Sequence, residues 1–355
     1  MKFVIDGVFL TQNTTGIQRF AYEICSELDN LIEKDVLEIL VPEDATFLPD
    51  YKNISIVKYG KLHGYLWQQI DFCYYLKKKK YQGICLTNEV PVLFPKGIVC
   101  LHDISYKVNP EFFNYGKGRL SVIWHKINYL AIAKSKMKIL TVSEFSKKEI
   151  MRIYGIDEQR IDIIYNAWQH MNRISENEFV YDKYGFLKKN EYYFSMSTLA
   201  ANKNFKWILY AAKQNPQYQF AIAGGGKLRG AAEAMGFTNL SNVHFLGYVS
   251  DEEAKTLMHN CKAFLFPTLY EGFGIPPLEA ISCGCKQIIV SDIPCMHEIY
   301  GDYAQYINPT DYNSIVLPEN NEYKKINNLL KKYSWKESAQ RLFYVIKKEM
   351  KENIY

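Results

Sequence analysis

Short apolar segments and amphipathic stretches alternate along this chain, in two successive blocks. Each apolar segment has the length of a buried strand, and most are followed by polar residues and then by apolar side chains at helical spacing. This alternation is typical of a parallel sheet with helices on both faces. The length of 355 residues leaves room for two domains of roughly 150 residues each. We therefore predict an α/β fold with two doubly wound sheets.

The strand pattern also locates the domains. The predicted strands of the first block are Phe3–Ile5, Glu38–Val41, Ile54–Val57, Gly83–Leu86, Gly97–Leu101 and Lys138–Val142. Those of the second block are Tyr192–Met196, Gln219–Ala223, Val243–Phe245, Ala263–Phe266 and Gln287–Val290. Between the blocks, residues 172–190 are polar and charged and show no strand pattern. We predict a first domain over 1–171, a connection over 172–190, a second domain over 191–330, and a C-terminal helix over 331–355 that packs back on the first domain.

The composition excludes several classes of protein. With 48% hydrophobic and 23% charged residues, the chain is globular in composition and not disordered. Its apolar runs are far shorter than the roughly 20 residues of a membrane-spanning helix. Asp6 interrupts the N-terminal apolar run too early for a signal peptide, so we expect a cytoplasmic protein. The net charge of +5 is too small to indicate a nucleic-acid partner.

The eight cysteines lie mostly in apolar sequence context, and none belongs to a Cys-x-x-Cys pair. We therefore expect buried free thiols. Cys283 and Cys285, near His297, do not have the ligand spacing of a zinc site. We predict no metal site.

The segment Phe266–Ala280 is the richest in residues suited to chemistry. It follows a predicted strand and opens a helix that has two prolines in its first turn. Its glycines allow a ligand to approach the backbone, and free amides at a helix start favour a phosphate. Glu271 before the helix and Glu279 inside it can hold hydroxyl groups on either side of a diphosphate. The alternative is an ordinary helix start with two surface acids.

This Glu271-x7-Glu279 segment, with its Gly-Phe-Gly-Ile-Pro-Pro core, resembles the retaining nucleotide-sugar glycosyltransferases of family 4. Further matching landmarks follow in the family's order: Thr15–Ile17, His102-Asp103, Val142–Ser146, Tyr165–Ala167, Phe245–Asp251 and Ser291–Glu298. The resemblance extends over nearly the whole chain. The Glu-pair segment and the N-terminal loop are similar to those of mannosyl- and rhamnosyl-transferring members. It implies the GT-B fold, in which two Rossmann-like domains face an inter-domain cleft.

The resemblance implies roles for individual residues. Glu279 would hold the ribose hydroxyls, Glu271 would contact the donor sugar, and Lys203 would stabilise the leaving diphosphate. His102 would lie near the sugar and the acceptor as the third catalytic candidate. The remaining donor-binding candidates are Gly16, Asn166, Thr198, Tyr248, Gly272, Phe273, Gly274 and Ile275.

The resemblance also implies the reaction, which is a retaining, metal-independent sugar transfer without a further cofactor. The donor would be a nucleoside-diphosphate sugar, with GDP-mannose as the first expectation and a UDP-sugar as the second. The acceptor would be a glycan or a polyprenyl-diphosphate-linked glycan in the synthesis of lipopolysaccharide, capsule or another cell-surface polysaccharide. A dehydrogenase is disfavoured because neither the N-terminal loop nor residues 224–226 have Gly-x-Gly-x-x-Gly spacing.

The chain departs from the family at two basic positions. Members often have an arginine directly before the lysine, and some have a basic residue six positions before it. Asn202 and Ser197 stand at these positions here. The nearby basic residues that could substitute are Lys206, Lys227 and Arg229. The missing guanidinium leaves a second hypothesis open, in which the chain is a catalytically weak or inactive nucleotide-sugar-binding partner subunit.

Residues 112–138 combine basic and aromatic side chains without any Asp or Glu. One interpretation is a solvated basic helix with its aromatic side chains in the core. The other is contact with an anionic membrane surface or a lipid diphosphate acceptor. The second interpretation would attach the protein peripherally to the inner face of the membrane.

Overall fold

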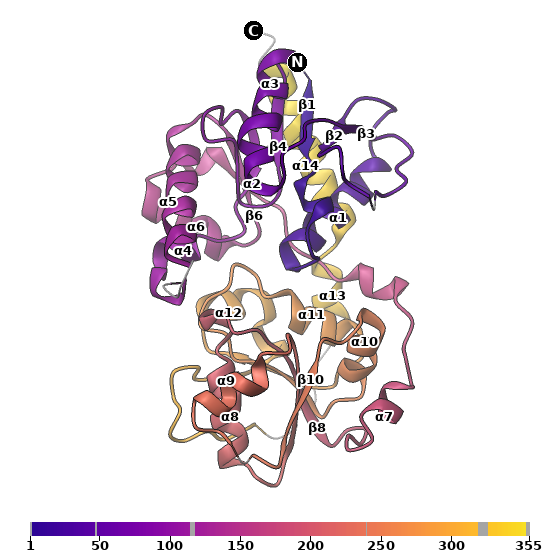
Figure 1. The fold of residues 1–355 in the computed structure, drawn as a ribbon, viewed down its shortest axis with the longest axis vertical. Coiled ribbons are helices and arrows are strands. Elements are labelled where there is room, and N and C mark those ends of the chain that lie inside the picture. The colour runs from indigo at the N-terminus through magenta and orange to yellow at the C-terminus, as the bar shows by residue number, and fades with distance from the viewer. Residues whose placement is uncertain (1, 47, 114–117, 239, 319–325, 353–355) are drawn as a thin grey trace. The chain divides into compact units, whose positions relative to one another are not determined.

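The computed structural model describes residues 2–46, 48–113, 118–238, 240–318 and 326–352. The chain divides into two compact units (Figure 1). The first consists of Met1–Asn166 with Ser334–Tyr355, and the second is Ala167–Tyr333. The sequence predicts the end of the first domain at residue 171 and the start of the C-terminal helix at residue 331. Residues 172–190, predicted as a connection, lie in the second unit and include the short helix α7 (Val180–Lys183).

The first unit is built on a seven-stranded parallel sheet in the order β3-β2-β1-β4-β5-β6-β7. Its strands are β1 (Phe3–Asp6), β2 (Glu38–Val41), β3 (Ser55–Lys58), β4 (Gln82–Cys85), β5 (Gly97–Cys100), β6 (Lys138–Thr141) and β7 (Ile161–Ile163). Its helices are α1 (Gly16–Asp29), α2 (Gly64–Leu66), a π-helical turn (Trp67–Phe72), α3 (Cys73–Lys79), α4 (Ser105–Val108), α5 (Gly118–Lys134), α6 (Glu144–Tyr154) and α14 (Trp335–Glu352).

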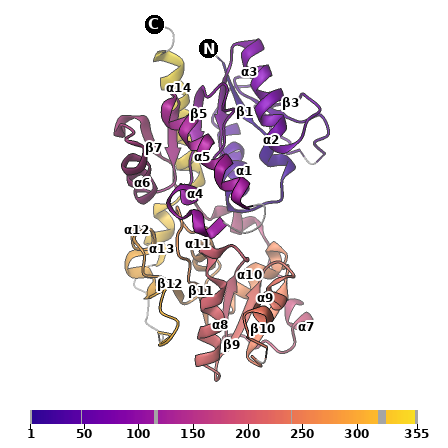
Figure 2. The ribbon, with the colours of Figure 1, turned by 60° about the vertical axis from the view of Figure 1, so that its left-hand side comes forward.

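Both faces of this sheet are buried, as a doubly wound arrangement requires. Val4 of β1 and Val99 of β5 belong to one core cluster with side chains of α3 and α5. The alternation of strand side chains directs the buried neighbours Ile5 and Ile98 to the opposite face. Helices α1 and α14 of this unit pack against each other (Figure 1), and α4 adjoins α5 in both views (Figures 1 and 2).

The second unit repeats this plan with a six-stranded parallel sheet in the order β10-β9-β8-β11-β12-β13. Its strands are β8 (Tyr192–Met196), β9 (Gln219–Ala223), β10 (Val243–Gly247), β11 (Ala263–Phe266), β12 (Ile288–Ser291) and β13 (Gln305–Ile307). Its further helices are α8 (Phe205–Gln214), α9 (Leu228–Ala234), α10 (Asp251–His259), α11 (Ile275–Ser282), α12 (Pro294–Tyr300) and α13 (Ile326–Lys332).

Each sheet has one point where the strand order reverses. In the first unit it lies between β1 and β4, and in the second between β8 and β11. Loops that leave the carboxyl ends of two such strands diverge to opposite faces, which opens a crevice where ligands bind in α/β proteins. The two reversal points are therefore the places at which to search each unit for a site.

The structure corrects the predicted elements in three places. Strands β7 and β13 were not predicted, because both are three-residue edge strands with polar residues in them. In β7, Asp162 is compatible with a strand because the Lys138 ammonium lies 2.6 Å from its carboxylate. The stretch predicted as one C-terminal helix over 331–355 contains the end of α13 and then α14, and Ser334 accepts a bond from the Glu337 amide at the start of α14. Residues 353–355 of that stretch lie outside the described residues.

Ser143 is the N-cap of α6, since its hydroxyl accepts a bond from the Ser146 amide at 3.0 Å. The prediction of buried free thiols is confirmed. The eight cysteines are all buried and free.

Candidate functional site

Lys203 and Glu271 meet at the reversal point of the second sheet. Lys203 ends a short 3-10 turn after β8, and Glu271 lies in the loop after β11. The Lys203 Nζ is 2.6 Å from the Glu271 Oε1. Thr268 orients this carboxylate, because its hydroxyl lies 3.0 Å from the same oxygen. The structure thus brings together two of the three predicted catalytic residues.

The two loops that carry this pair are tied to each other through Asn202. Its carbonyl accepts a bond from the Leu269 amide at 2.7 Å and lies 2.7 Å from the Thr268 hydroxyl. The Asn202 side-chain amide donates to the Tyr270 carbonyl at 3.4 Å. Asn202, which stands where the family often has arginine, therefore has a structural role in positioning the pair.

The loop from Glu271 to Gly274 turns directly into α11. Gly274 has φ +81°, a left-handed conformation that favours glycine. A Cβ on Gly274 would also lie 2.7 Å from the Met296 Cε, and the Gly274 carbonyl accepts a bond from the Tyr300 hydroxyl. Phe273 is buried and packs edge-on against Tyr333 at 5.1 Å between ring centroids. These contacts hold the start of α11 in place, where the helix dipole favours an anion.

Glu279, inside α11, has a partner that sequence reasoning missed. Its Oε1 lies 2.9 Å from the Nε2 of His170, which is 2% exposed. His170 belongs to a 3-10 turn (Gln169–Arg173) that packs against α11. Because the two residues are 109 positions apart, no local sequence pattern connects them.

Two further predicted residues of the second unit, Thr198 and Tyr248, lie in loops that follow strands. The Thr198 hydroxyl accepts a bond from the Ala200 amide at 3.3 Å, just beyond β8. Tyr248, just beyond β10, is 83% exposed and free to contact a ligand. Gly224 lies against Ser197, since a Cβ on this glycine would be 2.0 Å from the Ser197 carbonyl oxygen. Lys227, exposed at the start of α9, follows this contact within a few residues.

The predicted residues of the first unit are distributed over three loops. Gly16 begins α1, and His102 follows β5. The His102 ring is buried, its Nε2 lies 2.9 Å from the Leu86 carbonyl, and the Phe20 ring packs edge-on against it at 4.6 Å. Burial lowers the pKa of His102 to about 4, so the ring is neutral at pH 7 and donates to that carbonyl. Asn166 is buried after β7, and its Oδ1 makes no hydrogen bond within the described residues.

Comparison with known proteins places this geometry in a class. Residues 176–342 match the family of glycosyl transferases group 1. The O-antigen chain mannosyltransferase RfbU of Salmonella typhimurium is 28% identical over 235 residues, which cover 65% of this chain and 62% of that protein. The O-antigen chain mannosyltransferase B of Escherichia coli is 26% identical over 348 residues, 89% of this chain and 88% of the relative. The sucrose-phosphate synthase of Thermosynechococcus elongatus shares the fold over 100% of this chain and 98% of its own, with 15% identity and a TM-score of 0.66.

The fold is therefore GT-B, with two parallel-sheet α/β domains. The match of residues 176–342 and the mannosyltransferase relatives support a glycosyltransferase that is similar to family 4, as the Glu271 and Glu279 segment implies.

Two further observations concern the predicted absences. In the part of the chain that the structure describes, no helix is both long and apolar enough to cross a membrane. Within the same residues, no three His, Cys, Asp or Glu side chains gather in a way that could hold a metal ion. Metal independence stays a prediction.

Proposed function

We propose that this protein is a retaining glycosyltransferase that moves a sugar from a nucleoside-diphosphate sugar to a glycan or lipid-linked glycan in cell-surface polysaccharide synthesis. The observation that carries the proposal is the Lys203 and Glu271 pair, 2.6 Å apart beside the glycine loop that opens α11. An ammonium and a carboxylate at this position can contact the two groups that the breaking bond joins, which are the diphosphate and the donor sugar.

The charges of the pair suit the bond that breaks. The Lys203 ammonium can neutralise the diphosphate as it leaves, which is electrostatic stabilisation of a developing charge. Glu271 can hold hydroxyls of the donor sugar, and Glu279 those of the ribose. In the reaction, the acceptor oxygen bonds to the anomeric carbon on the face from which the diphosphate departs. The acceptor proton passes to the leaving diphosphate oxygen, so no protein base is required for it.

GDP-mannose is the first donor to test, and a UDP-sugar is the second. Support for mannose comes from the two relatives, which are both O-antigen chain mannosyltransferases.

The test is a thermal-shift screen with GDP, UDP, dTDP and their sugars, because a ligand that binds only the native state raises the midpoint of unfolding. We expect GDP and GDP-mannose to give the largest shifts, and these shifts to fall in a Glu279→Ala variant but not in a Glu233→Ala variant of exposed α9. A screen without any nucleotide-dependent shift would contradict the proposal. Nucleotide binding without turnover would favour the partner-subunit hypothesis.

We further propose peripheral attachment to anionic membranes through 112–138. Helix α5 of this segment exposes an apolar stripe at helical spacing, formed by Leu120, Ile123, Ile127 and Leu130. Exposed Arg119 and Lys134 lie on the same helix, whereas 114–117 of the proposed segment are outside the described residues. The aromatic residues of the helix do not form part of this stripe. Tyr129 is buried, and Trp124 contacts Tyr65 of α2. An apolar stripe flanked by basic residues is the pattern of an interfacial helix.

The membrane proposal is tested by co-sedimentation with vesicles at low salt. We expect more binding to vesicles with phosphatidylglycerol than to neutral phosphatidylcholine vesicles. Ile123→Asn combined with Ile127→Asn should reduce that binding, whereas Val316→Asn, a more exposed apolar position of the second unit, should not. Equal binding to both kinds of vesicle would overturn the proposal.

A further inference from the structure

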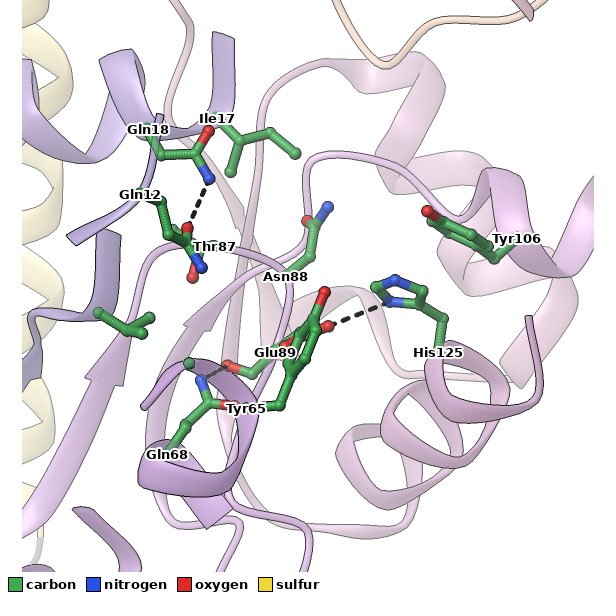
Figure 3. A pocket seen from close by; sticks show the side chains of 12 residues that line it. Gln12, Ile17, Gln18, Tyr65, Gln68, Thr87, Asn88, Glu89, Tyr106 and His125 are labelled. Carbon is green, nitrogen blue, oxygen red and sulfur yellow. Dashed lines mark hydrogen bonds and ion pairs between the residues drawn. The ribbon is translucent and has the colours of Figure 1, made fainter. Parts of the chain in front are cut away.

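A cavity of about 240 Å³ lies in the first unit at the reversal point between β1 and β4 (Figure 3). Residues that follow these two strands form one side of it, and residues of α1, α2, the π-helical turn, α4 and α5 form the rest. This position is equivalent to that of Lys203 and Glu271 in the second unit, since both follow the strands at which the order reverses. The donor-site residues do not account for this cavity.

The wall of the cavity contains a buried acid and a buried imidazole. Glu89 and His125 face each other, and the Glu89 Oε1 lies 3.5 Å from the His125 Nδ1 (Figure 3). The residues are 6% and 7% exposed. Neither of these two atoms makes a hydrogen bond within the described residues. Buried polar atoms in native proteins are almost always hydrogen-bonded to protein or to ordered water, so two such atoms without a hydrogen bond on a cavity wall favour a polar ligand or water there.

The surroundings of Glu89 keep this wall uncharged near neutral pH. Burial raises the pKa of Glu89 to about 8, with the Trp124 indole acting in the opposite direction and Asp6 adding to the rise. Burial lowers the pKa of His125 to about 4. The other titratable groups near Glu89 are Cys85 of β4, Tyr65 of α2 and Tyr106 of α4. Tyr106 stacks on the His125 ring at 3.8 Å. At pH 7 the pair therefore offers a carboxylic acid O–H and a neutral imidazole.

The rest of the lining matches that polarity. The described lining residues include amide and hydroxyl side chains but neither lysine nor arginine. A cavity without a cation is unsuited to phosphate or carboxylate ligands, which depend on charge-assisted hydrogen bonds. The cavity volume of about 240 Å³ is below the roughly 300–1,000 Å³ of sites for drug-sized ligands. A cavity of this size suits a single sugar unit.

We infer that this cavity binds one uncharged sugar unit of the acceptor, with Glu89 and His125 hydrogen-bonding its hydroxyls, and that it rejects anionic sugars. This inference rests on the proposed glycosyltransferase function and specifies the chemistry of its acceptor. Glu89 and His125 are specificity-determining residues in this account. They do not act on the bond that breaks, which is the role of Lys203 and Glu271 at the donor site.

The experiment measures binding to the full chain by calorimetry without any donor. The probes are methyl α-mannoside, methyl β-glucoside, methyl β-galactoside and methyl N-acetyl-β-glucosaminide, each paired with its 6-phosphate. We expect at least one neutral glycoside to bind and its phosphate to bind at least tenfold more weakly. Glu89→Ala and His125→Ala should each weaken binding by about tenfold, because each leaves a sugar hydroxyl without its hydrogen-bond partner in the cavity. Glu111→Gln, an exposed position of the same unit, should bind like the unchanged chain.

The conservative variant supplies an independent readout. Glu89→Gln should bind at pH 7 nearly as well as the unchanged chain, because it keeps one donor and one acceptor. Above pH 8 the unchanged chain should lose affinity as Glu89 ionises, whereas Glu89→Gln should not. This comparison decides the question even if Glu89→Ala does not fold.

Four results would overturn the inference: no glycoside binds, a 6-phosphate binds as well as its neutral partner, Glu89→Ala binds unchanged, or the affinity of the unchanged chain is independent of pH. If no glycoside binds, water alone satisfies these two atoms. The nucleotide thermal shift, measured on the same samples, separates this result from a failure of the proposed function. A nucleotide shift without glycoside binding removes the acceptor inference only, and glycoside binding without a nucleotide shift removes the donor proposal.

Discussion

The Lys203 ammonium and the Glu271 carboxylate are 2.6 Å apart although 68 residues separate them in the chain. The parallel sheet accounts for this proximity, because β8 and β11 are adjacent and both residues follow the carboxyl ends of these strands. The backbone bond from Leu269 to Asn202 then fixes the two loops in register. A pair held by the topology of the sheet is present before any ligand binds, which reduces the reorganisation needed during catalysis.

His170 is predicted to act as a positioning residue for Glu279. Its Nε2 lies 2.9 Å from the Glu279 Oε1, so His170→Ala should leave the carboxylate less well oriented toward ribose. We expect the KM for the donor to rise about tenfold, equal to about 1.4 kcal/mol, with kcat changed much less. His170→Gln should restore part of the loss, because its amide can still donate. An unchanged donor KM in the alanine variant would refute this role.

Gly274→Ala is predicted to destabilise the second unit. The backbone there has φ +81°, which costs a residue with a Cβ roughly 1–2 kcal/mol, and the new methyl group would crowd the Met296 Cε at 2.7 Å. The thermal midpoint should fall by several degrees. Gly185→Ala is the matched control, because the nearest atom to its Cβ would be 3.8 Å away. Equal midpoints for the two variants would show that the loop is not constrained as described.

Lys227 is predicted to supply part of the charge that arginine supplies in relatives. It is exposed just beyond Gly224, whose backbone lies against Ser197, one of the two positions that lack the family's basic residue. Lys227→Ala should weaken donor binding about threefold to tenfold at low salt and less at high salt, because exposed charges are screened. Lys213→Ala, an exposed lysine near the end of α8, should change nothing. Titration calorimetry with the donor nucleotide checks this, and identical affinities would exclude Lys227.

The buried neutral His102 predicts a specific loss of stability in acid. Its pKa is lowered from 6.5 to about 4 by burial, so the unfolded chain binds this proton at a higher pH than the folded chain. The resulting stabilisation is complete above pH 6.5 and is lost as the pH falls toward 4. His102→Gln should therefore show a smaller fall of the thermal midpoint over this range than the unchanged chain. Parallel curves for the two would contradict the prediction, and exposed His63→Gln serves as the control.

The sequence predicted most strands because their side chains are apolar and buried. Glu38–Val41, Tyr192–Met196 and Ala263–Phe266 were predicted with the bounds that the structure has. The edge strands β7 and β13 were missed because their polar residues hide a strand pattern and only contacts with neighbouring residues stabilise them.

The same distinction applies to the candidate site. The loop with Glu271 and Glu279 is a continuous segment, so its motif is visible in the sequence. His170, Glu89 and His125 were missed because each depends on a tertiary contact, such as the approach of Glu89 to a helix that follows much later in the chain. Isolated Glu and His residues of this kind have no local pattern that distinguishes them from structural ones.

The most direct test of the account is the rate of nucleotide release and sugar transfer with GDP-mannose and a panel of UDP-sugars, measured for Lys203→Ala and Glu271→Gln. We predict that kcat/KM falls at least a hundredfold in each variant, or about 3 kcal/mol of transition-state stabilisation, with retention of the anomeric configuration in the product. Lys213→Ala and Glu233→Gln should keep the activity of the unchanged chain. Transfer at an undiminished rate in either site variant would contradict the assignment of this pair to catalysis.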